Sequence, residues 1–168
     1  MSDSSGYIHD AYGIDREKLA WIMDMKNNRR GRISEYPKQF PSATFTASES
    51  EPSLNGLWGI NVDVALPCAT QNEINGEEAK KLVANSVIAV VEGANMPCTP
   101  EAVEVFHESG ILFAPGKASN AGGVATSGLE MSQNSLRLGW SREEVDERLE
   151  NIMINIHKNT AEMAKKYG

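Results

Sequence analysis

Apolar and polar positions along the chain change their spacing several times, and each change marks a predicted element. Near the N-terminus, Asp15 precedes a helical pattern in which Leu19, Ile22 and Met23 recur at the spacing of one helix face. The pattern predicts a helix from Asp15 to Gly31, because a glycine commonly ends a helix.

The segment from Ile33 to Leu57 has no clear period. It contains three prolines and a serine- and glutamate-containing cluster from Ser48 to Ser53, which is typical of loops. Phe45 lies in a short run that favours an edge strand. We therefore expect a loop here, with one short strand around Phe45.

Later in the chain, apolar runs alternate with helical patterns. Strands are predicted at 60–67, 87–93 and 111–116, and helices at 76–85 and 99–110. The run 87–93 is apolar almost throughout, which is typical of a strand buried on both faces. Strands and helices that alternate at this spacing predict an α/β fold with a parallel sheet and right-handed crossovers.

Two long helices are predicted to close the chain. One extends from about Asn120 to Leu138, and the other from Ser141 to Tyr167, where Ser141 and Glu144 have the spacing of a capping box. An apolar stripe follows the last helix, formed by Val145, Leu149, Ile152, Met153 and Ile156. We expect this stripe to pack on a sheet or another helix, because such stripes are ordinary core.

Composition narrows the function classes. The 168 residues, 40% of them hydrophobic, suffice for one core, and the net charge of −7 argues against nucleic-acid binding. No run of about 18 apolar residues predicts a membrane span, and the N-terminus lacks the features of a secretory signal. The chain has two cysteines, too few for a disulfide scaffold. We expect a cytoplasmic protein with neither nucleic acid nor membrane as partner.

Small residues and amides follow each predicted strand of the parallel sheet. Open α/β sheets bind ligands at this carboxyl edge. The carboxamide of nicotinamide has one donor group and one acceptor, and an asparagine side chain can satisfy both. Asn95 and Asn120 are therefore candidates for this contact. Turn preferences alone also place asparagine and glycine in loops, but three such loops at one edge favour a ligand site.

Several sharper motifs are excluded. The GKAS sequence at 116–119 lacks the glycine and the Ser/Thr of a P-loop at the required positions, and no G-x-G-x-x-G occurs. The two cysteines and three histidines lack the spacing of a metal site. Lys117 is expected to be a solvated lysine. We therefore expect no catalytic and no metal-ligating residue in this chain.

Five segments together resemble the hexameric glutamate dehydrogenases, most closely the bacterial-type enzymes, most of which use NADP. They are SDSSGYI, LPCATQNEI, VVEGANMP, LFAPGKASNAGGVATSGLEMSQNS and RLGWSREEVDERL. The resemblance implies an incomplete Rossmann-like parallel sheet flanked by helices, with long C-terminal helices. Residues 1–168 would be part of a dinucleotide-binding domain, without its first strand and glycine-rich turn, the substrate domain and the final helical segment.

The resemblance also implies roles for individual residues. The turn at Asp3 and Ser4 would contact the adenine ribose and a 2′-phosphate. Ala69 and Thr70, in the loop after the strand at 60–67, would line the approach of the cofactor. Asn95 and Asn120 would bind its nicotinamide side. The implied cofactor-binding residues are thus Asp3, Ser4, Ala69, Thr70, Asn95 and Asn120.

Val124 and Ser127 match positions that line the glutamate pocket in this family. Ser127 would donate to the side-chain carboxylate of the substrate, near the positive N-terminus of its helix. The alternative for Ser127 is a hydroxyl bonded back to its own helix.

The implied reaction interconverts L-glutamate and 2-oxoglutarate plus ammonium, in a parent enzyme that is a homohexamer. NADP is the expected cofactor, with NAD as the alternative, because Asp3 favours free ribose hydroxyls whereas Ser4 favours a phosphate. The catalytic lysine and aspartate of the family have no counterpart here, so the chain alone is expected to be inactive. A naturally short, non-catalytic module that binds a nucleotide or a partner is the other reading, and the sequence leaves open whether Met1 is a natural start.

Overall fold

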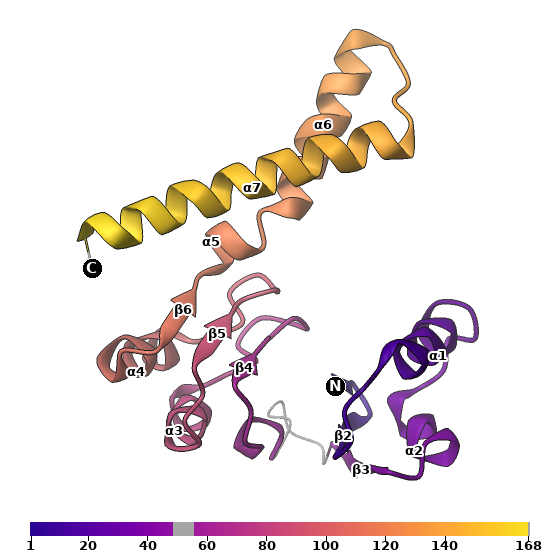
Figure 1. The fold of residues 1–168 in the computed structure, drawn as a ribbon, viewed down its shortest axis with the longest axis vertical. Coiled ribbons are helices and arrows are strands. Elements are labelled where there is room, and N and C mark those ends of the chain that lie inside the picture. Colours follow the sequence, from indigo (N-terminus) through magenta and orange to yellow (C-terminus); the bar gives the residue numbers. More distant parts are fainter. Residues whose placement is uncertain (49–55, 168) are drawn as a thin grey trace. The chain divides into compact units, whose positions relative to one another are not determined.

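The computed structural model describes residues 1–48 and 56–167. They belong to two compact units, Met1–Ile60 (the N-terminal unit) and Asn61–Gly168 (the C-terminal unit). Each unit combines helices with its own three-stranded sheet (Figure 1). The predicted α/β class is therefore confirmed in its coarse form, a mixed fold with small sheets.

The sheet of the N-terminal unit is antiparallel, with the strand order β1-β2-β3. Ile8 pairs with Phe45, so Phe45 does lie on an edge strand, as predicted. The strands are β1 (Ser2–Asp3), β2 (Gly6–Asp10) and β3 (Ala43–Ala47).

The expectation of a loop from Ile33 to Leu57 is wrong for much of that segment. It contains two short helices before β3 and one 3₁₀ turn at its end: η1 (Ile33–Glu35), α2 (Tyr36–Gln39) and η2 (Leu57–Gly59). These elements are held by tertiary contacts, since Ile33 and Tyr36 are buried in the core, and local propensity does not report such contacts. Residues 49–55, which include most of the predicted Ser48–Ser53 cluster, lie outside the described residues.

Helix α1 (Arg16–Asn27) begins where predicted, because the side chain of Asp15 accepts a hydrogen bond from the backbone N–H of Lys18. It ends before Gly31, with Asn28 as its C-cap, since Arg30 takes a left-handed conformation that turns the chain. The predicted buried face is also partly wrong.

Within α1, Ile22 and Met25 are buried, whereas Leu19 and Met23 are largely exposed. Helical spacing allows either face, and the packing partners select one. The core of the N-terminal unit is formed by Ile8, Ile22, Met25, Ile33, Tyr36 and Ala43.

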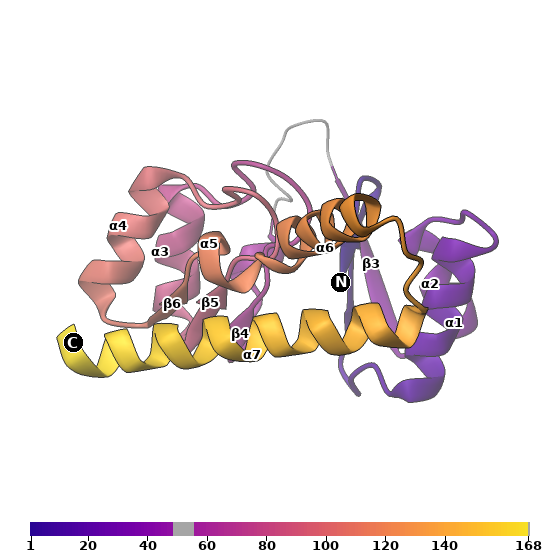
Figure 2. The ribbon, with the colours of Figure 1, turned by 90° about the horizontal axis from the view of Figure 1, so that it is seen from above.

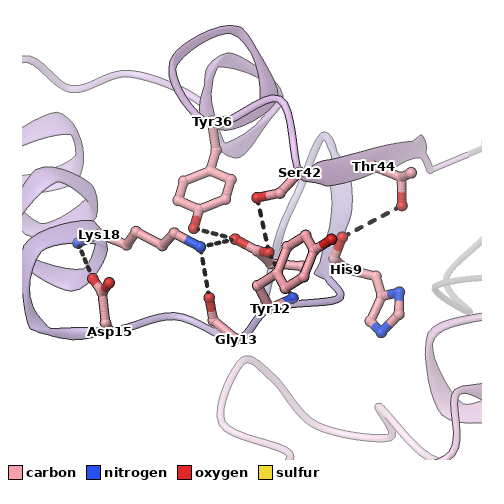
Figure 3. Close-up of polar contacts among 9 residues, drawn as sticks. His9, Tyr12, Gly13, Asp15, Lys18, Tyr36, Ser42 and Thr44 are labelled. Carbon is pink, nitrogen blue, oxygen red and sulfur yellow. Dashed lines mark hydrogen bonds and ion pairs between the residues drawn. The ribbon is translucent and has the colours of Figure 1, made fainter.

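The carboxylate of Asp10 links the elements of this unit, and its partners Lys18, Tyr36 and Ser42 are labelled in Figure 3. It is 1% exposed and accepts hydrogen bonds from Lys18 Nζ at 2.7 Å, Tyr36 Oη at 2.9 Å and Ser42 Oγ at 3.0 Å. The ion pair with Lys18, helped by these other donors, holds the pKa of Asp10 well below its usual range. One buried carboxylate thus links β2, α1 and α2.

This network predicts an acid-sensitive N-terminal unit. The folded-state pKa of Asp10 is depressed, so below about pH 4 the unfolded chain takes up the proton first and the free energy of unfolding falls. Asp10→Asn should lower the unfolding midpoint at pH 7 and flatten its dependence on pH between pH 5 and pH 2, about the range over which such a carboxylate titrates. Thermal unfolding followed across that range tests this, with the exposed Glu17→Gln as control. A variant as stable and as acid-sensitive as the unchanged chain would contradict it.

The C-terminal unit contains the predicted alternation of strands and helices. Its sheet is parallel with the order β4-β5-β6, and the two crossover helices lie side by side against it (Figures 1 and 2). The elements are β4 (Val64–Ala65), α3 (Gly76–Ala84), β5 (Ala89–Val91), α4 (Pro100–Ser109) and β6 (Leu112–Ala114). The strands are shorter than predicted, and 60–67 is reduced to two paired residues.

The prediction that 87–93 is buried on both faces is wrong in this structure. Val90 of β5 is buried together with Phe106 of α4, but Val64 and Leu112 of the neighbouring strands are 49% and 69% exposed. Among the described elements, α3 and α4 cover one face of the sheet, and the other face keeps its apolar side chains exposed.

Three helices follow the sheet: α5 (Gly116–Ser119), α6 (Gly122–Leu136) and α7 (Arg142–Tyr167). The predicted capping box is confirmed, since Ser141 Oγ accepts from the N–H of Glu144 and the Glu144 carboxylate accepts from the N–H of Ser141. The apolar stripe packs on α6, where Leu149 and Met153 lie beside Gly122. Helix α5 was not predicted. The helix that was expected from about Asn120 follows it and begins at Gly122.

Candidate functional site

Three loops leave the carboxyl edge of the parallel sheet, and backbone hydrogen bonds hold them against one another. The N–H groups of Gly93 and Ala94 donate to the carbonyl of Pro67 at 2.9 and 3.1 Å, and the N–H of Glu92 donates to the carbonyl of Ala114 at 3.0 Å. A Cβ on Gly93 would collide with the sulfur of Cys68, so only glycine allows the first two loops to approach this closely. The three predicted loops therefore do meet at one edge.

The two candidate asparagines are directly hydrogen-bonded. Asn120 Nδ2 donates to Asn95 Oδ1 at 2.7 Å, which joins the loop after β5 to the C-cap of α5. We call these two side chains the amide pair. Neither side chain makes another hydrogen bond with a described residue, so the pair keeps one NH₂ group and one carbonyl oxygen for a ligand. Exchanging the oxygen and nitrogen of both side chains leaves the same two groups.

Ala69 and Thr70 lie in the loop after β4, where both are exposed. The N–H of Ala69 donates to a carboxylate oxygen of the buried Glu73 at 2.9 Å. This bond fixes the loop at the same edge of the sheet as the amide pair. The structure gives no direct contact between Thr70 and the pair.

Val124 and Ser127 lie one turn apart near the start of α6, and both are exposed. Residues three apart share a helix face, so the two side chains can contact one ligand. The Ser127 hydroxyl donates to the carbonyl of Gly123 at 3.4 Å. This is the back-bonded arrangement that was the alternative for Ser127, and a ligand acceptor would have to replace that long bond.

The Asp3 carboxylate is fully hydrogen-bonded within the N-terminal unit. Its carboxylate accepts from Lys26 Nζ, from the N–H of Ile33 at 2.9 Å, and from both the N–H and the hydroxyl of Ser5. Burial acts to raise the pKa of Asp3, but these donors, with Lys26 first among them, outweigh it and hold the pKa well below its usual range. All of the roughly four acceptor positions of a carboxylate are therefore filled. In this arrangement Asp3 has none left for a ribose hydroxyl.

Ser4 has a partner that the sequence did not reveal. Arg32 Nη1 donates to Ser4 Oγ at 2.6 Å, and both side chains are exposed. Arg32 makes no ion pair with a described carboxylate, so most of its guanidinium remains available. A guanidinium beside a hydroxyl forms a set of donors suited to a phosphate group. The basic run RRGR at 29–32 was the signal, but nothing local connects it to Ser4.

Within residues 1–48 and 56–167, no three His, Cys, Asp or Glu side chains gather in a way that could hold a metal ion. No helix in the described part of the chain is long and apolar enough to cross a membrane.

Several known proteins similar to this chain are glutamate dehydrogenases. The chain is 58% identical over 167 residues to the NAD(P)-specific glutamate dehydrogenase of Xylanibacter ruminicola, covering 99% of this chain and 35% of that enzyme. It is 53% identical over 156 residues to the NADP-specific enzyme of Escherichia coli K12, covering 93% and 33%. An NAD-specific enzyme of Bacteroides fragilis is 48% identical over all 168 residues. The chain thus spans about a third of the length of these relatives.

Solved structures of glutamate dehydrogenases also match this chain. The glutamate dehydrogenase of Plasmodium falciparum matches 99% of this chain with a TM-score of 0.83 and 44% identity, and the match covers 34% of that protein. A hetero-hexameric glutamate dehydrogenase from Thermus thermophilus, 23% identical with a TM-score of 0.70, shares the fold. The profile of one family matches residues 1–168 in full. The chain therefore belongs to the Glutamate/Leucine/Phenylalanine/Valine dehydrogenase family.

Proposed function

We propose that this chain forms the cofactor-binding part of a cytoplasmic glutamate dehydrogenase, which interconverts L-glutamate and 2-oxoglutarate plus ammonium with NADP(H). The observation that carries the proposal is the amide pair, Asn95 and Asn120 at 2.7 Å. Its unused NH₂ and carbonyl match the carbonyl and NH₂ of a nicotinamide carboxamide. The bound nicotinamide supplies the hydride chemistry, and these residues orient it.

Fixed orientation is the contribution of the amide pair to the reaction. A carboxamide held at both of its polar atoms cannot rotate, so one face of the ring is presented to the substrate and transfer becomes effectively unimolecular. The backbone hydrogen bonds between the three loops keep this edge ordered. Ala69 and Thr70 line the approach to the same edge in this proposal.

Ser4 and Arg32 favour NADP over NAD. Their hydroxyl and guanidinium provide donors for a 2′-phosphate. Lys26 pairs with Asp3, a neighbouring carboxylate that would otherwise repel the phosphate. NAD, which lacks the phosphate, would lose these contacts but keep those of the nicotinamide end. The relatives include enzymes named for NADP, for NAD and for both, so the cofactor preference varies among them.

Val124 and Ser127 would form one wall of the substrate site in this proposal. Val124 is 73% exposed, and it would pack on the methylene groups of glutamate. The Ser127 hydroxyl would turn from Gly123 to the substrate carboxylate. The remainder of the site, the homohexameric assembly and the dinucleotide-binding domain as a whole are proposed from the family resemblance.

A hybrid enzyme tests this function directly. In it, the residues of this chain replace the matching segment of the X. ruminicola enzyme, to which 167 of them align. We expect the hybrid to oxidise NADPH only when both 2-oxoglutarate and ammonium are present. A folded hybrid that binds NADPH but does not turn over would contradict the proposal.

The chain alone is expected to be catalytically silent. None of its candidate residues can perform the proton transfers that general acid–base catalysis of this reaction needs. NADPH absorbance should stay at the blank rate when the 168-residue chain is mixed with 2-oxoglutarate and ammonium. Turnover above the blank would show that the chain carries catalytic groups of its own.

A further inference from the structure

Two buried glutamates stand at the carboxyl edge of the sheet, Glu73 and Glu92, and Glu92 contacts both loops that carry the amide pair. It directly follows β5, is 7% exposed, and forms no ion pair with a described residue. Burying a carboxylate without a cation is costly unless donors surround it. The donors around Glu92 therefore indicate which part of the structure it stabilises.

The first group of contacts leads to Asn120. Glu92 Oε2 accepts from the N–H of Gly116 at 2.7 Å, and the Glu92 main-chain carbonyl accepts from Ser119 Oγ at 2.6 Å. Gly116 and Ser119 are the first and last residues of α5, and Asn120 is its C-cap. The Glu92 side chain thus holds the first residue of the short helix that carries Asn120. The Ser119 hydroxyl lies within reach of the main-chain carbonyls of Ala114 and Pro115 as well, at 3.3 and 3.0 Å.

The second contact leads to Asn95. Glu92 Oε1 accepts from the N–H of Cys98 at 3.4 Å, which closes the segment 93–97 into a loop with Asn95 at its centre. Burial, followed by a hydrogen bond to Glu92, raises the pKa of the Cys98 thiol, so this group stays protonated and can donate. One oxygen of Glu92 therefore serves each loop.

We infer that Glu92 is a positioning residue for carboxamide recognition: it sets the relative position of Asn95 and Asn120, and Ser119 assists it. This inference rests on the proposed function. Glu92 is buried beneath the loops, so it acts through the amide pair and does not touch the cofactor itself.

Glu92→Gln is the substitution that tests this inference most directly. Both oxygens of Glu92 accept from N–H groups, so the amide nitrogen of glutamine must face a donor whichever way it turns. One of the two loops is then released. The matched control is Glu78→Gln, since Glu78 is 6% exposed and also accepts from one backbone N–H, that of Asn75 in the capping box of α3.

The geometric claim is tested in the 168-residue chain without any ligand. With ¹⁵N-labelled asparagine side chains, Glu92→Gln should speed water exchange of the Asn120 amide hydrogens roughly tenfold, as local opening becomes easier. Glu78→Gln should leave that rate unchanged. If Glu92→Gln does not fold, Glu92→Asp keeps the charge but shortens the side chain by one methylene group, and it should show the same effect, since both N–H contacts lengthen. An unchanged exchange rate in a folded Glu92→Gln or Glu92→Asp variant would overturn the inference.

The functional claim is tested in the hybrid enzyme by comparing NADPH with the analogue in which the carboxamide NH₂ is a methyl group. The unchanged hybrid should prefer NADPH on the order of tenfold, the worth of about one hydrogen bond, and Glu92→Gln should abolish that preference. A Glu92 variant that weakens both ligands equally would mark a merely structural residue and overturn the inference. If the unchanged hybrid shows no preference, the proposed role of the amide pair fails, and the exchange measurement alone then decides the role of Glu92.

Discussion

Asn120→Asp in the hybrid enzyme is expected to weaken NADPH binding about 100-fold, the combined effect of a lost hydrogen bond and a repulsive charge of about 1.4 kcal/mol each. Asn95 can turn its NH₂ group toward the new carboxylate at the 2.7 Å separation of the amide pair, but the two side chains then offer only oxygen atoms to a ligand. The donor for the carboxamide oxygen is therefore lost. The aspartate also places a negative charge where the carboxamide should bind.

The Kd for NADPH, measured by quenching of protein fluorescence, checks this expectation. Asn151→Asp is the matched control, because Asn151 is an exposed asparagine of α7 whose amide bonds only to its own helix, at the carbonyl of Glu147. If Asn120→Asp and Asn151→Asp bind NADPH equally well, the amide pair does not hold the carboxamide.

Arg32→Ala in the hybrid enzyme is expected to raise the Kd for NADPH about 10- to 100-fold, since charge-assisted hydrogen bonds contribute about 1.5 to 3 kcal/mol. The Kd for NADH should stay the same, because NADH lacks the 2′-phosphate. The arginine and Ser4 act together through their 2.6 Å contact. Ser4→Ala should therefore give a smaller change of the same kind.

The preference for NADPH over NADH is the quantity to measure for these variants. Arg16→Ala removes an exposed arginine at the start of α1 and serves as the control. An Arg32 variant that keeps the preference of the unchanged hybrid would show that the 2′-phosphate is bound elsewhere.

The sequence predicted the parts of the C-terminal unit that depend on local signals. The capping residues of α4, Thr99 and Gly110, are where they were expected, and the alternation of strands and helices gave the parallel order. Because parallel strands end at a common edge, the strand order placed the loops of Asn95 and Asn120 at the same edge of the sheet. The direct hydrogen bond between the two side chains was not predicted.

Contacts between distant residues escaped prediction. Arg32 contacts Ser4 across 28 positions, and the donors around Asp10 come from two helices and a turn. In the sequence, Glu92 is only a polar residue that ends an apolar run. Its importance depends on its burial and on two backbone N–H groups, and neither leaves a mark in the residue pattern.

The hydrophobic pattern also gave wrong predictions of which faces of the strands and helices are covered. The apolar run 87–93 indicated burial on both faces, yet Leu112 on the neighbouring strand is 69% exposed. Hydrophobic patterning states which side chains require cover and not which segment provides it. The same reason explains why Met25, rather than Met23, lies in the core of the N-terminal unit.

A crystal structure of the hybrid enzyme with NADPH bound is the most direct test of the central claim, that the amide pair recognises the nicotinamide carboxamide. We expect the carboxamide oxygen to accept from the free NH₂ of the pair and its nitrogen to donate to the free carbonyl, each at about 2.9 Å. A nicotinamide ring bound with its carboxamide out of hydrogen-bonding reach of both Asn95 and Asn120 would contradict the claim.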